Sequence, residues 1–301
     1  MRKTSRNTYL YLFILLSSLS ALVSTTTQAS VSGSQETIEA FCRDWSNKLR
    51  TVEYEGCMAL DLKVAAHKSP EGRLLTYREF VPKSAQIKTP LPKGKILLIS
   101  GIHGDEYAAI SIGYLWMQAM LERHNSNQNH WLFLPLTNPD GLFRSDPATR
   151  VNARGVDLNR NFPSPDWKDA ALNFWKNHYR KNKRRFPGFS PASEIETQWM
   201  VSMIERFQPD AIISVHAPYG LLDYDGPEHA EPDKIGALNY RELGTFPGSL
   251  GRYAGEHLNI PVLTIELSSA GRMPTEKEIV QMWQDIEDWT HQKLEYKEVD
   301  F

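Results

Sequence analysis

The sequence predicts an α/β fold with a mixed, largely parallel central sheet and helices on both of its faces. Two observations predict it: short apolar runs of strand length recur along the chain, and longer segments of helical character separate them. Continuous apolar runs are typical of strands buried on both faces. Strands that alternate with helices indicate a sheet covered by helices.

Four apolar runs are expected to form the central strands. The first reads Lys-Ile-Leu-Leu-Ile-Ser at 95–100, between glycine and proline residues that commonly bound strands. The others cover residues 131–136, 210–215 and 261–265.

Three segments are expected to be helical. Residues 107–123 are rich in Ala, Leu, Met and Trp and predict a buried helix. Residues 193–207 predict a second helix, opened by a capping box of Ser193 and Glu196. Residues 274–296 form the last helix, with tryptophans on its apolar side.

The N-terminus is typical of a secretory signal peptide. Three basic residues precede a mostly apolar run of 14 residues at 10–23, and a short stretch of small and polar residues leads to Ala29. A retained anchor is the alternative, but the run falls short of the about 20 residues that span a bilayer. We expect residues 1–29 to be removed, which leaves a secreted, periplasmic protein with no stable membrane anchor.

The remaining 272 residues are enough for one large domain. We divide them into an N-terminal segment, 30–69, and a main domain, 70–301. Removal of three basic residues and no acidic one changes the net charge from −2 to about −5, which argues against a nucleic-acid partner. The sequence says nothing about oligomeric state.

Two cysteines, Cys42 and Cys57, lie 15 residues apart in the N-terminal segment. An exported protein favours a disulfide between them, worth on the order of 3 kcal/mol for so short a loop. Two buried free thiols are the alternative. The spacing is not that of a redox-active pair, so we expect a structural role.

Acidic and imidazole side chains follow three of the predicted strands. His103 and Glu106 come after the first strand, His216 ends the third, and Glu266 ends the fourth. Ligands of open α/β sheets bind beyond the carboxyl ends of strands, so we expect these side chains to lie close together. The other seven histidines do not follow a central strand, and we expect structural or surface roles for them.

Two imidazoles and one carboxylate form a ligand set that catalytic zinc accepts, with a further position open to water. We expect one Zn²⁺ per chain, bound by His103, Glu106 and His216. The set leaves a net charge of +1 that acidifies water, and Glu266 is the expected acid–base residue. Each motif alone is weak evidence, because a solvated turn or a hydrogen-bonded histidine gives the same pattern. The occurrence of all of them at strand ends is stronger evidence for a metal site than any one motif.

Five motifs resemble those of zinc metallocarboxypeptidases of the carboxypeptidase A type, in the same order. They are HGDE at 103–106, NPDG at 138–141, R-x-N-x-x-GVDLNRNFP at 150–163, SVH at 214–216 and TIEL at 264–267. The resemblance covers about residues 70–275. Segments near 190–197 and 247–250 are most similar to the murein peptide amidase-like bacterial branch.

The resemblance implies a metallocarboxypeptidase-like fold and a zinc peptidase domain over 70–301. It implies that His103, Glu106 and His216 bind the zinc ion. It also implies that Glu266 acts as general base and then as the acid for the leaving amine. The bacterial branch cuts the bond between γ-D-glutamate and diaminopimelate, so the implied substrate is a peptidoglycan-derived peptide.

The same resemblance implies roles for the polar residues of the GVDLNRNFP region. Arg150 matches the arginine that stabilises the oxyanion, with Arg154 as a competitor for that role. Asn159 and Arg160 match the pair that binds the terminal carboxylate of the substrate, which a planar guanidinium can do bidentately. Asp157 is expected to be a turn residue, or to orient a ligand histidine.

Three features leave two interpretations each. No tyrosine lies at 243–247, where many metallocarboxypeptidases carry a mobile one, so Tyr240 is a weak candidate and otherwise a core residue. The basic run 176–185 forms a solvated loop, or attracts anionic cell-wall polymer. Asp223 and Asp225 lie on a solvated loop, or contact the amino group of a diaminopimelate-like side chain.

Three other functions remain open. A carboxypeptidase for ordinary peptides would share every motif. A deacylase of the aspartoacylase or succinylglutamate desuccinylase type would share the H-G-x-E start, although the NPDG and GVDLNRNF motifs favour a peptidase. A non-catalytic wall-binding module is disfavoured by the intact Glu266.

Overall fold

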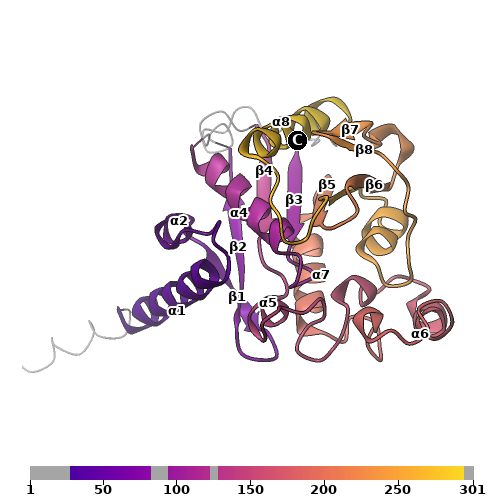
Figure 1. Cartoon of the computed structure of the whole chain (residues 1–301), viewed down its shortest axis with the longest axis horizontal. Helices are drawn as coiled ribbons and strands as arrows, with labels where there is room; N and C mark the ends of the chain where they lie inside the picture. The colour runs from indigo at the N-terminus through magenta and orange to yellow at the C-terminus, as the bar shows by residue number, and fades with distance from the viewer. Residues whose placement is uncertain (1–27, 83–93, 123–127, 295–301) are drawn as a thin grey trace, which may run out of the picture.

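Four parallel strands, β4, β3, β5 and β9, form the middle of a seven-stranded mixed sheet (Figure 1). The computed structural model describes residues 28–82, 94–122 and 128–294. Antiparallel strands complete the order β1-β2-β4-β3-β5-β9-β6. The predicted mixed sheet is therefore confirmed. Its strands are β1 Lys63–Lys68, β2 Leu74–Phe80, β3 Lys95–Ser100, β4 His130–Leu134, β5 Ala211–His216, β6 Leu221–Asp225 and β9 Val262–Glu266; β7 Lys234–Ile235 and β8 Leu238–Asn239 form a separate ribbon.

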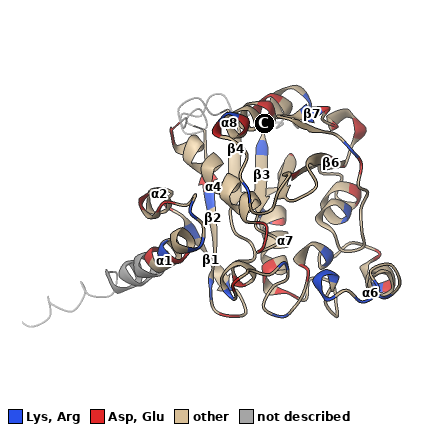
Figure 2. Cartoon of the chain, viewed as in Figure 1, with Lys and Arg blue, Asp and Glu red and all other residues tan. Residues whose placement is uncertain are grey.

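Strand β3 illustrates how the sheet separates two apolar layers. Ile96 and Leu98 pack with side chains of α4 and α8, whereas Leu97 and Ile99 pack with side chains of α7. Successive strand residues point to opposite faces, so a continuous apolar run serves both layers. Figure 2 shows charged residues mostly on helices and loops, while β3 carries one only at its start. Helices on both faces are confirmed.

The helices agree with the prediction in place and differ from it at their ends. The α-helices are α1 Gln28–Lys48, α2 Tyr54–Ala59, α4 Tyr107–Glu122, α5 Pro139–Phe143, α6 Trp167–Asn177, α7 Ile195–Phe207 and α8 Glu276–Gln292. Short 3-10 segments are η1 Leu158–Arg160, η2 Lys183–Arg185 and η3 Glu228–Ala230, and η4 Gly251–His257 is a π-helix.

The capping box predicted for α7 is wrong. Its N-cap is Glu194, whose side chain makes no cap hydrogen bond, and Ser193 Oγ donates instead to Glu194 Oε1 at 2.7 Å. A complete capping box occurs at α8, between Thr275 and Glu278. Helix α8 ends at Gln292, earlier than predicted. Ser193 Oγ accepts instead from Asn161 Nδ2 at 3.0 Å, a tertiary contact that the local sequence does not indicate.

A disulfide joins Cys42 of α1 to Cys57 of α2, so this prediction is confirmed. Both cysteines are fully buried, in the same apolar layer as α4 and α8. Strand β1, from the segment 30–69, pairs with β2 of the main domain. Residues 1–27 of the predicted signal peptide lie outside the described residues. Among the described helices, none is long and apolar enough to cross a membrane.

Candidate active site

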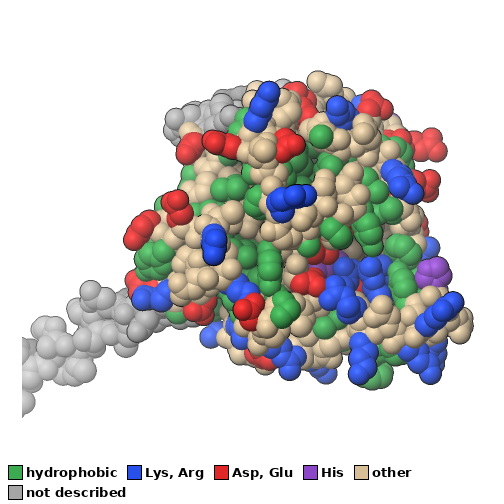
Figure 3. Space-filling view, viewed as in Figure 1, with side chains coloured by type: hydrophobic (Ala, Val, Ile, Leu, Met, Phe, Trp, Pro, Cys, Tyr) green, Lys and Arg blue, Asp and Glu red, His purple; other side chains and the backbone are tan. Residues whose placement is uncertain are grey.

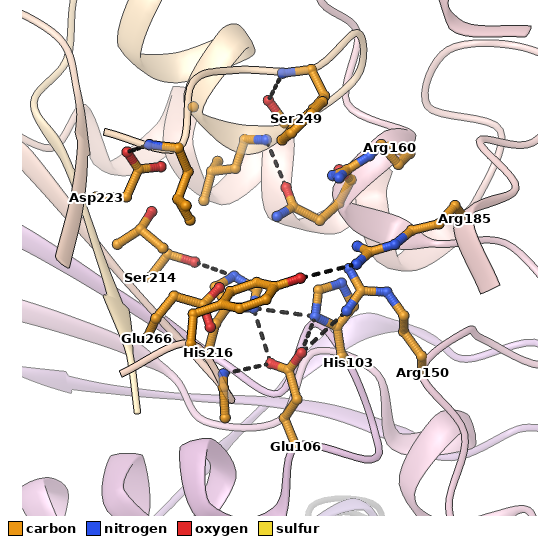
Figure 4. A pocket seen from close by; sticks show the side chains of 18 of the residues that line it. His103, Glu106, Arg150, Arg160, Arg185, Ser214, His216, Asp223, Ser249 and Glu266 are labelled. Carbon is orange, nitrogen blue, oxygen red and sulfur yellow. Dashed lines mark hydrogen bonds and ion pairs between the residues drawn. The ribbon is translucent and has the colours of Figure 1, made fainter. Parts of the chain in front are cut away.

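The carboxyl ends of β3, β5 and β9 meet at one edge of the sheet and carry four of the predicted site residues (Figure 4). His103 and Glu106 lie in the turn after β3. His216 ends β5, and Glu266 ends β9 in register with it. All four side chains are buried. The strand-end arrangement expected from the sequence therefore brings them together.

The turn after β3 packs tightly on the Asn-Pro-Asp-Gly motif. A Cβ at Gly104 would lie 2.1 Å from the carbonyl carbon of Gly141, so only glycine fits there. Asn138 Nδ2 donates to the carbonyl oxygens of Ile102 at 3.1 Å and Arg150 at 3.2 Å. The motif thus fixes this turn relative to the segment that carries Arg150.

Three of the four side chains present metal-binding atoms to one point. The Nδ1 atoms of His103 and His216 lie 3.2 Å apart. One carboxylate oxygen of Glu106 is 2.7 Å from His103 Nδ1, and the other is 3.0 Å from His216 Nδ1. Two nitrogens that each lie about 2.0–2.1 Å from a tetrahedral zinc ion are about 3.3 Å apart. The group can therefore hold a metal ion of this kind.

Hydrogen bonds on the far side of each ring favour Nδ1 as the ligand atom. Asp157 Oδ1 lies 3.0 Å from His103 Nε2, and Ser214 Oγ lies 2.9 Å from His216 Nε2. A proton on each Nε2 donates to these oxygens and leaves both Nδ1 lone pairs directed at the same point. Lone pairs at this separation repel unless a cation lies between them. Asp157 thus contacts His103, in addition to capping η1.

The buried carboxylate of Glu106 is compensated by the imidazoles around it. Burial opposes its ionisation, but His103 and His216 outweigh burial and hold the pKa of Glu106 below its usual value. The pKa of Asp157 also lies well below its usual value, because Arg150 and His103 outweigh the effect of complete burial. Negative charge is therefore retained at both positions, as binding of a cation requires.

Glu266 has a different environment. Burial raises the pKa of its carboxyl to about 7, although His216 opposes the shift. Its Oε2 atom is buried and has no hydrogen-bond partner among the described residues. A carboxylate with a pKa near neutrality can both accept and return a proton at neutral pH.

Of Arg150 and Arg154, the two candidates for the oxyanion role, Arg150 lies beside the metal-binding group. Its Nη1 is 3.2 Å from Glu106 Oε1, and its Nε donates to Asp157 Oδ2 at 3.0 Å. Arg154 has a side chain that is 63% exposed, and its nearest carboxylate is Glu194 at 3.7 Å. Arg154 does not line the cavity described next.

Asn159 and Arg160 lie on η1 and line the cavity that also contains the metal-binding group. The guanidinium of Arg160 donates to Tyr179 Oη at 2.9 Å, and its Cζ lies 4.4 Å from the centre of the Phe246 ring. Burial lowers the pKa of Arg160, although Asp157 opposes the shift. A buried guanidinium that faces a cavity is a site for a carboxylate.

One cavity of about 420 Å³ contains all seven predicted site residues in its wall: His103, Glu106, Arg150, Asn159, Arg160, His216 and Glu266. Asp223 and Asp225 also line it. Both lie on β6 rather than on a solvated loop, and Asp223 is buried. The cavity thus combines a metal-binding group, cationic side chains and a pair of carboxylates.

The sequence of this chain matches the zinc carboxypeptidase family over residues 61–228. The chain belongs to this family. The matched range includes the metal-binding group, Arg150, Asn159 and Arg160, and ends before Glu266, which the fold places beside them. The protein is accordingly a zinc metallopeptidase by family.

Several bacterial relatives carry the name murein peptide amidase A. That of Escherichia coli strain K12 is 31% identical over 181 residues, which cover 56% of this chain and 69% of the relative. That of Vibrio campbellii is 28% identical over 186 residues, with coverages of 57% and 68%.

Solved structures of other family members have the same fold. Carboxypeptidase A from Helicoverpa armigera aligns with a TM-score of 0.60 and 18% identity, covering 87% of this chain and 80% of that one. The murein-tripeptide amidase from Escherichia coli O157 aligns with a TM-score of 0.50 and 23% identity, covering 77% and 91%.

Beyond the zinc carboxypeptidase motifs, the cavity wall includes residues that the sequence analysis did not place in the site. Four belong to the basic run 176–185, which therefore is not only a solvated loop (Figure 3 shows basic side chains around a hollow that also exposes acidic ones). Motif spacing gave no signal for them, since they lie on connecting segments. The residues missed are His178, Tyr179, Arg184, Arg185, Tyr219 and Phe246.

Tyr240 does not line the cavity, and it packs against the apolar core, as the second interpretation expected. Phe246 occupies the corresponding loop beside Arg160. The phenol nearest to that arginine among the described residues comes from Tyr179, after α6. This is a departure from the family members that carry a tyrosine on the loop before the Gly-Ser segment.

Proposed function

We propose that this zinc carboxypeptidase hydrolyses the bond between γ-D-glutamate and diaminopimelate in peptidoglycan stem peptides. The observation that carries the proposal is one cavity in which a metal-binding group lies with a buried arginine and two carboxylates. A diaminopimelate residue at the end of a peptide presents the complementary groups, a terminal carboxylate and a side-chain ammonium. The murein peptide amidase relatives support the same substrate class.

His103, Glu106 and His216 are the proposed ligands of a single zinc ion, since their donor atoms have the spacing that zinc requires. When bound, zinc supplies a Lewis acid that polarises the scissile carbonyl and lowers the pKa of water. Asp157 and Ser214 hold the two imidazoles in the orientation that directs Nδ1 toward the ion.

Glu266 is the proposed general base and acid. Its carboxylate takes the proton of the attacking water and passes it to the departing nitrogen. Arg150, held by Glu106 and Asp157, is fixed in place before reaction and stabilises the negative charge that develops on the carbonyl oxygen. A cation that is already positioned needs no reorganisation when that charge appears.

Arg160 and Asn159 are the proposed site for the terminal carboxylate. Leu250 N donates to Asn159 Oδ1 at 2.8 Å, which fixes the amide of Asn159 on the cavity wall. Tyr179 and Phe246 hold the Arg160 guanidinium from two sides. A site of this kind selects a free chain end and makes the enzyme an exopeptidase.

Asp223 and Asp225 are the proposed site for the side-chain ammonium. Burial raises the pKa of Asp225 to about 7, with Asp223 as a further cause, and the opposing effect of Arg252 does not offset the shift. A Cβ at Gly251 would lie 1.9 Å from Asp225 Oδ2, so glycine at this position makes room for the carboxylate. An ammonium bound between the two would favour their charged forms.

The proposed place of action is the periplasm of a Gram-negative cell. The Cys42–Cys57 disulfide and the signal-peptide pattern support export. Cell-wall peptides would be available there, and no nucleic acid or stable membrane anchor is part of the proposal.

Mass spectrometry of muropeptides after incubation with the zinc-loaded mature protein tests the function. We expect release of free diaminopimelate from the tripeptide L-alanyl-γ-D-glutamyl-diaminopimelate. Rapid trimming of ordinary L-peptides with no action on the tripeptide would contradict the proposed substrate but would agree with a peptidase activity. Hydrolysis of N-acyl amino acids alone would identify a deacylase instead.

A further inference from the structure

Arg185 is a cation on the cavity wall whose nearest carboxylate is already engaged. Its Nη1 lies 3.8 Å from Asp157 Oδ2, beyond hydrogen-bonding distance. The same oxygen accepts Arg150 Nε at 3.0 Å. The other oxygen of Asp157 lies 3.0 Å from His103 Nε2 and accepts Asn159 N at 3.2 Å. The Asp157 carboxylate is therefore already engaged by closer groups, and Arg185 is the most distant of the groups around it.

The other cavity-lining arginines have closer partners. Arg184 Nη2 lies 2.7 Å from Asp105 Oδ2. Arg150 contacts two carboxylates, and Arg160 donates to the phenol of Tyr179. Besides Asp157, Arg185 has a long contact of 3.5 Å to Tyr219 Oη, and its Cζ lies 5.7 Å from the centre of the Tyr179 ring. Its side chain is 24% exposed, so a ligand in the cavity can reach it.

Arg185 lies far from the aspartates assigned to the leaving residue and shares the Tyr179 ring with Arg160, the Cζ atoms of the two arginines lying 5.7 and 5.5 Å from its centre. Figure 4 places Arg185 beside Arg150, across the metal-binding group from Asp223. Asp223 and Arg160 are assigned to the side chain and the terminal carboxylate of the leaving amino acid. Arg150, beside Arg185, is assigned to the scissile carbonyl, so a group on the acyl side of that bond comes within reach of Arg185.

A γ-linked glutamate carries an unusual group on that side. Its scissile carbonyl belongs to the side chain, and only two methylene groups separate this carbonyl from the carbon that bears a free α-carboxylate. An ordinary α-linked residue has no carboxylate at this place unless its own side chain supplies one. A guanidinium with free donors binds such a carboxylate bidentately.

We propose that Arg185 binds the α-carboxylate of the γ-linked glutamate and so selects γ-glutamyl over α-linked peptides. The proposal rests on the proposed function, because it assumes a γ-D-glutamyl substrate. It gives the basic run 176–185 a role inside the site. Arg150 remains assigned to the oxyanion and Arg160 to the terminal carboxylate. Each of these three arginines is thus assigned to one anionic group of the substrate.

The test compares two substrates that differ in one group. The first is L-alanyl-γ-D-glutamyl-diaminopimelate, and the second carries an α-carboxamide in place of the glutamate α-carboxylate. For wild-type protein we expect kcat/KM to be at least about 10-fold higher on the acid, since a hydrogen bond to a charged group is worth about 1.5–3 kcal/mol. Arg185→Ala should lower kcat/KM on the acid by about 10- to 100-fold and leave the amide nearly unchanged.

Arg184→Ala is the matched control, because Arg184 is adjacent in sequence and already paired with Asp105. It should leave the ratio of kcat/KM on the acid to kcat/KM on the amide within about twofold of the wild-type ratio. A tenfold change in this ratio would correspond to about 1.4 kcal/mol. Arg185→Lys keeps the charge without the planar fork and should give an intermediate ratio. Zinc content and thermal unfolding of each variant verify that the site is intact.

Three outcomes are decisive. Equal rates of the wild type on acid and amide would overturn the proposal while leaving the proposed function in place. Equal losses on both substrates in Arg185→Ala would overturn it as well, because the residue would then act without reading the carboxylate. A wild type that cleaves neither γ-linked substrate would remove the proposed function, and this inference with it.

Discussion

Glu266 and His216 face each other across two neighbouring parallel strands, at the edge of the sheet where the cavity lies. His216 directs a nitrogen toward the metal-binding point, while Glu266 keeps one buried oxygen without a hydrogen-bond partner among the described residues. Two residues in equivalent strand positions thus have different surroundings, which is why different roles are proposed for them. Burial raises the pKa of Glu266 to about 7, which suits proton transfer.

Glu266→Gln should therefore abolish turnover and spare metal binding. The amide keeps the shape of the carboxylate but cannot accept the proton of water, and general acid–base catalysis contributes about 10²- to 10⁴-fold. We expect kcat to fall by at least this factor, with one zinc ion per chain in elemental analysis. A variant with near-normal kcat would contradict the role of Glu266.

Arg160→Ala should weaken substrates that end in a free carboxylate. It should raise KM for a free-acid peptide and lower kcat/KM by about 10- to 100-fold, since hydrogen bonds between charged groups are worth about 1.5–3 kcal/mol. The C-terminal amide of the same peptide should lose far less. Arg154→Ala is the control, because Arg154 is exposed and lies outside the cavity wall. Equal losses on acid and amide would argue against an exopeptidase.

Residues at strand ends could be predicted from the sequence, and residues on connecting segments could be predicted only where a family motif marks them, as for Arg150 and Arg160. His103, His216 and Glu266 follow apolar runs whose strand character is evident, so their meeting at one edge follows from parallel pairing. Arg185 and Tyr179 lie beyond α6, where only tertiary packing turns the chain back toward the cavity. No spacing in the sequence encodes that return.

At the scale of elements, parallel strands were predictable and antiparallel ones were not. The four central strands are buried on both faces and therefore read as continuous apolar runs. Strand β1 is largely exposed, and β6 contains two aspartates, so neither has such a run. The acidic pair of β6 resembled a solvated loop for that reason, although pairing with β9 places it on the cavity wall.

Helix α7 contains a buried acid that should make stability depend on pH. Glu196 is fully buried, and burial raises the pKa of its carboxyl from 4.5 to about 7, although Asn152 donates to it. Between these values the folded protein binds one more proton than the unfolded chain does. The free energy of unfolding therefore falls as the pH rises from about 4.5 to about 7.

Glu196→Gln should remove the contribution of Glu196 to this dependence, while Glu266 and Asp225, whose pKa values are also raised to about 7, keep theirs. Above pH 7 the variant should be more stable than the wild type by up to about 3 kcal/mol, because one pKa unit corresponds to about 1.4 kcal/mol. Near the ordinary glutamate pKa of about 4.3 the two should be nearly equal. Urea unfolding of the zinc-loaded proteins across this range measures the difference. Glu205→Gln, exposed on the same helix, is the control and should show no such trend.

At the scale of the whole molecule, the N-terminal helices and the catalytic cavity lie at different parts of the sheet. Helices α1 and α2 lie by the edge that ends in β1, whereas the cavity lies at the ends of β3, β5 and β9 (Figure 1). Helices α1 and α2 contact the rest of the chain through the apolar layer, where Trp45 packs edge-on against Tyr114 of α4 at 5.6 Å between ring centres, and through polar contacts such as that from Gln118 Nε2 to the carbonyl oxygen of Gly56. Changes there should affect stability more than catalysis.

The Cys42–Cys57 disulfide offers the test of this separation. Because it links α1 to α2 over 15 residues, it restricts the unfolded chain and should contribute about 2–4 kcal/mol to the free energy of unfolding. Replacing both cysteines by serine should lower stability by about that amount. The double variant should keep one zinc ion and a wild-type kcat/KM well below its unfolding temperature. A large loss of kcat/KM in a folded double variant would show that the N-terminal helices do influence the cavity. Thiol titration of the unreduced, denatured wild type should find close to no free thiol. Two free thiols would show that the exported protein has no disulfide.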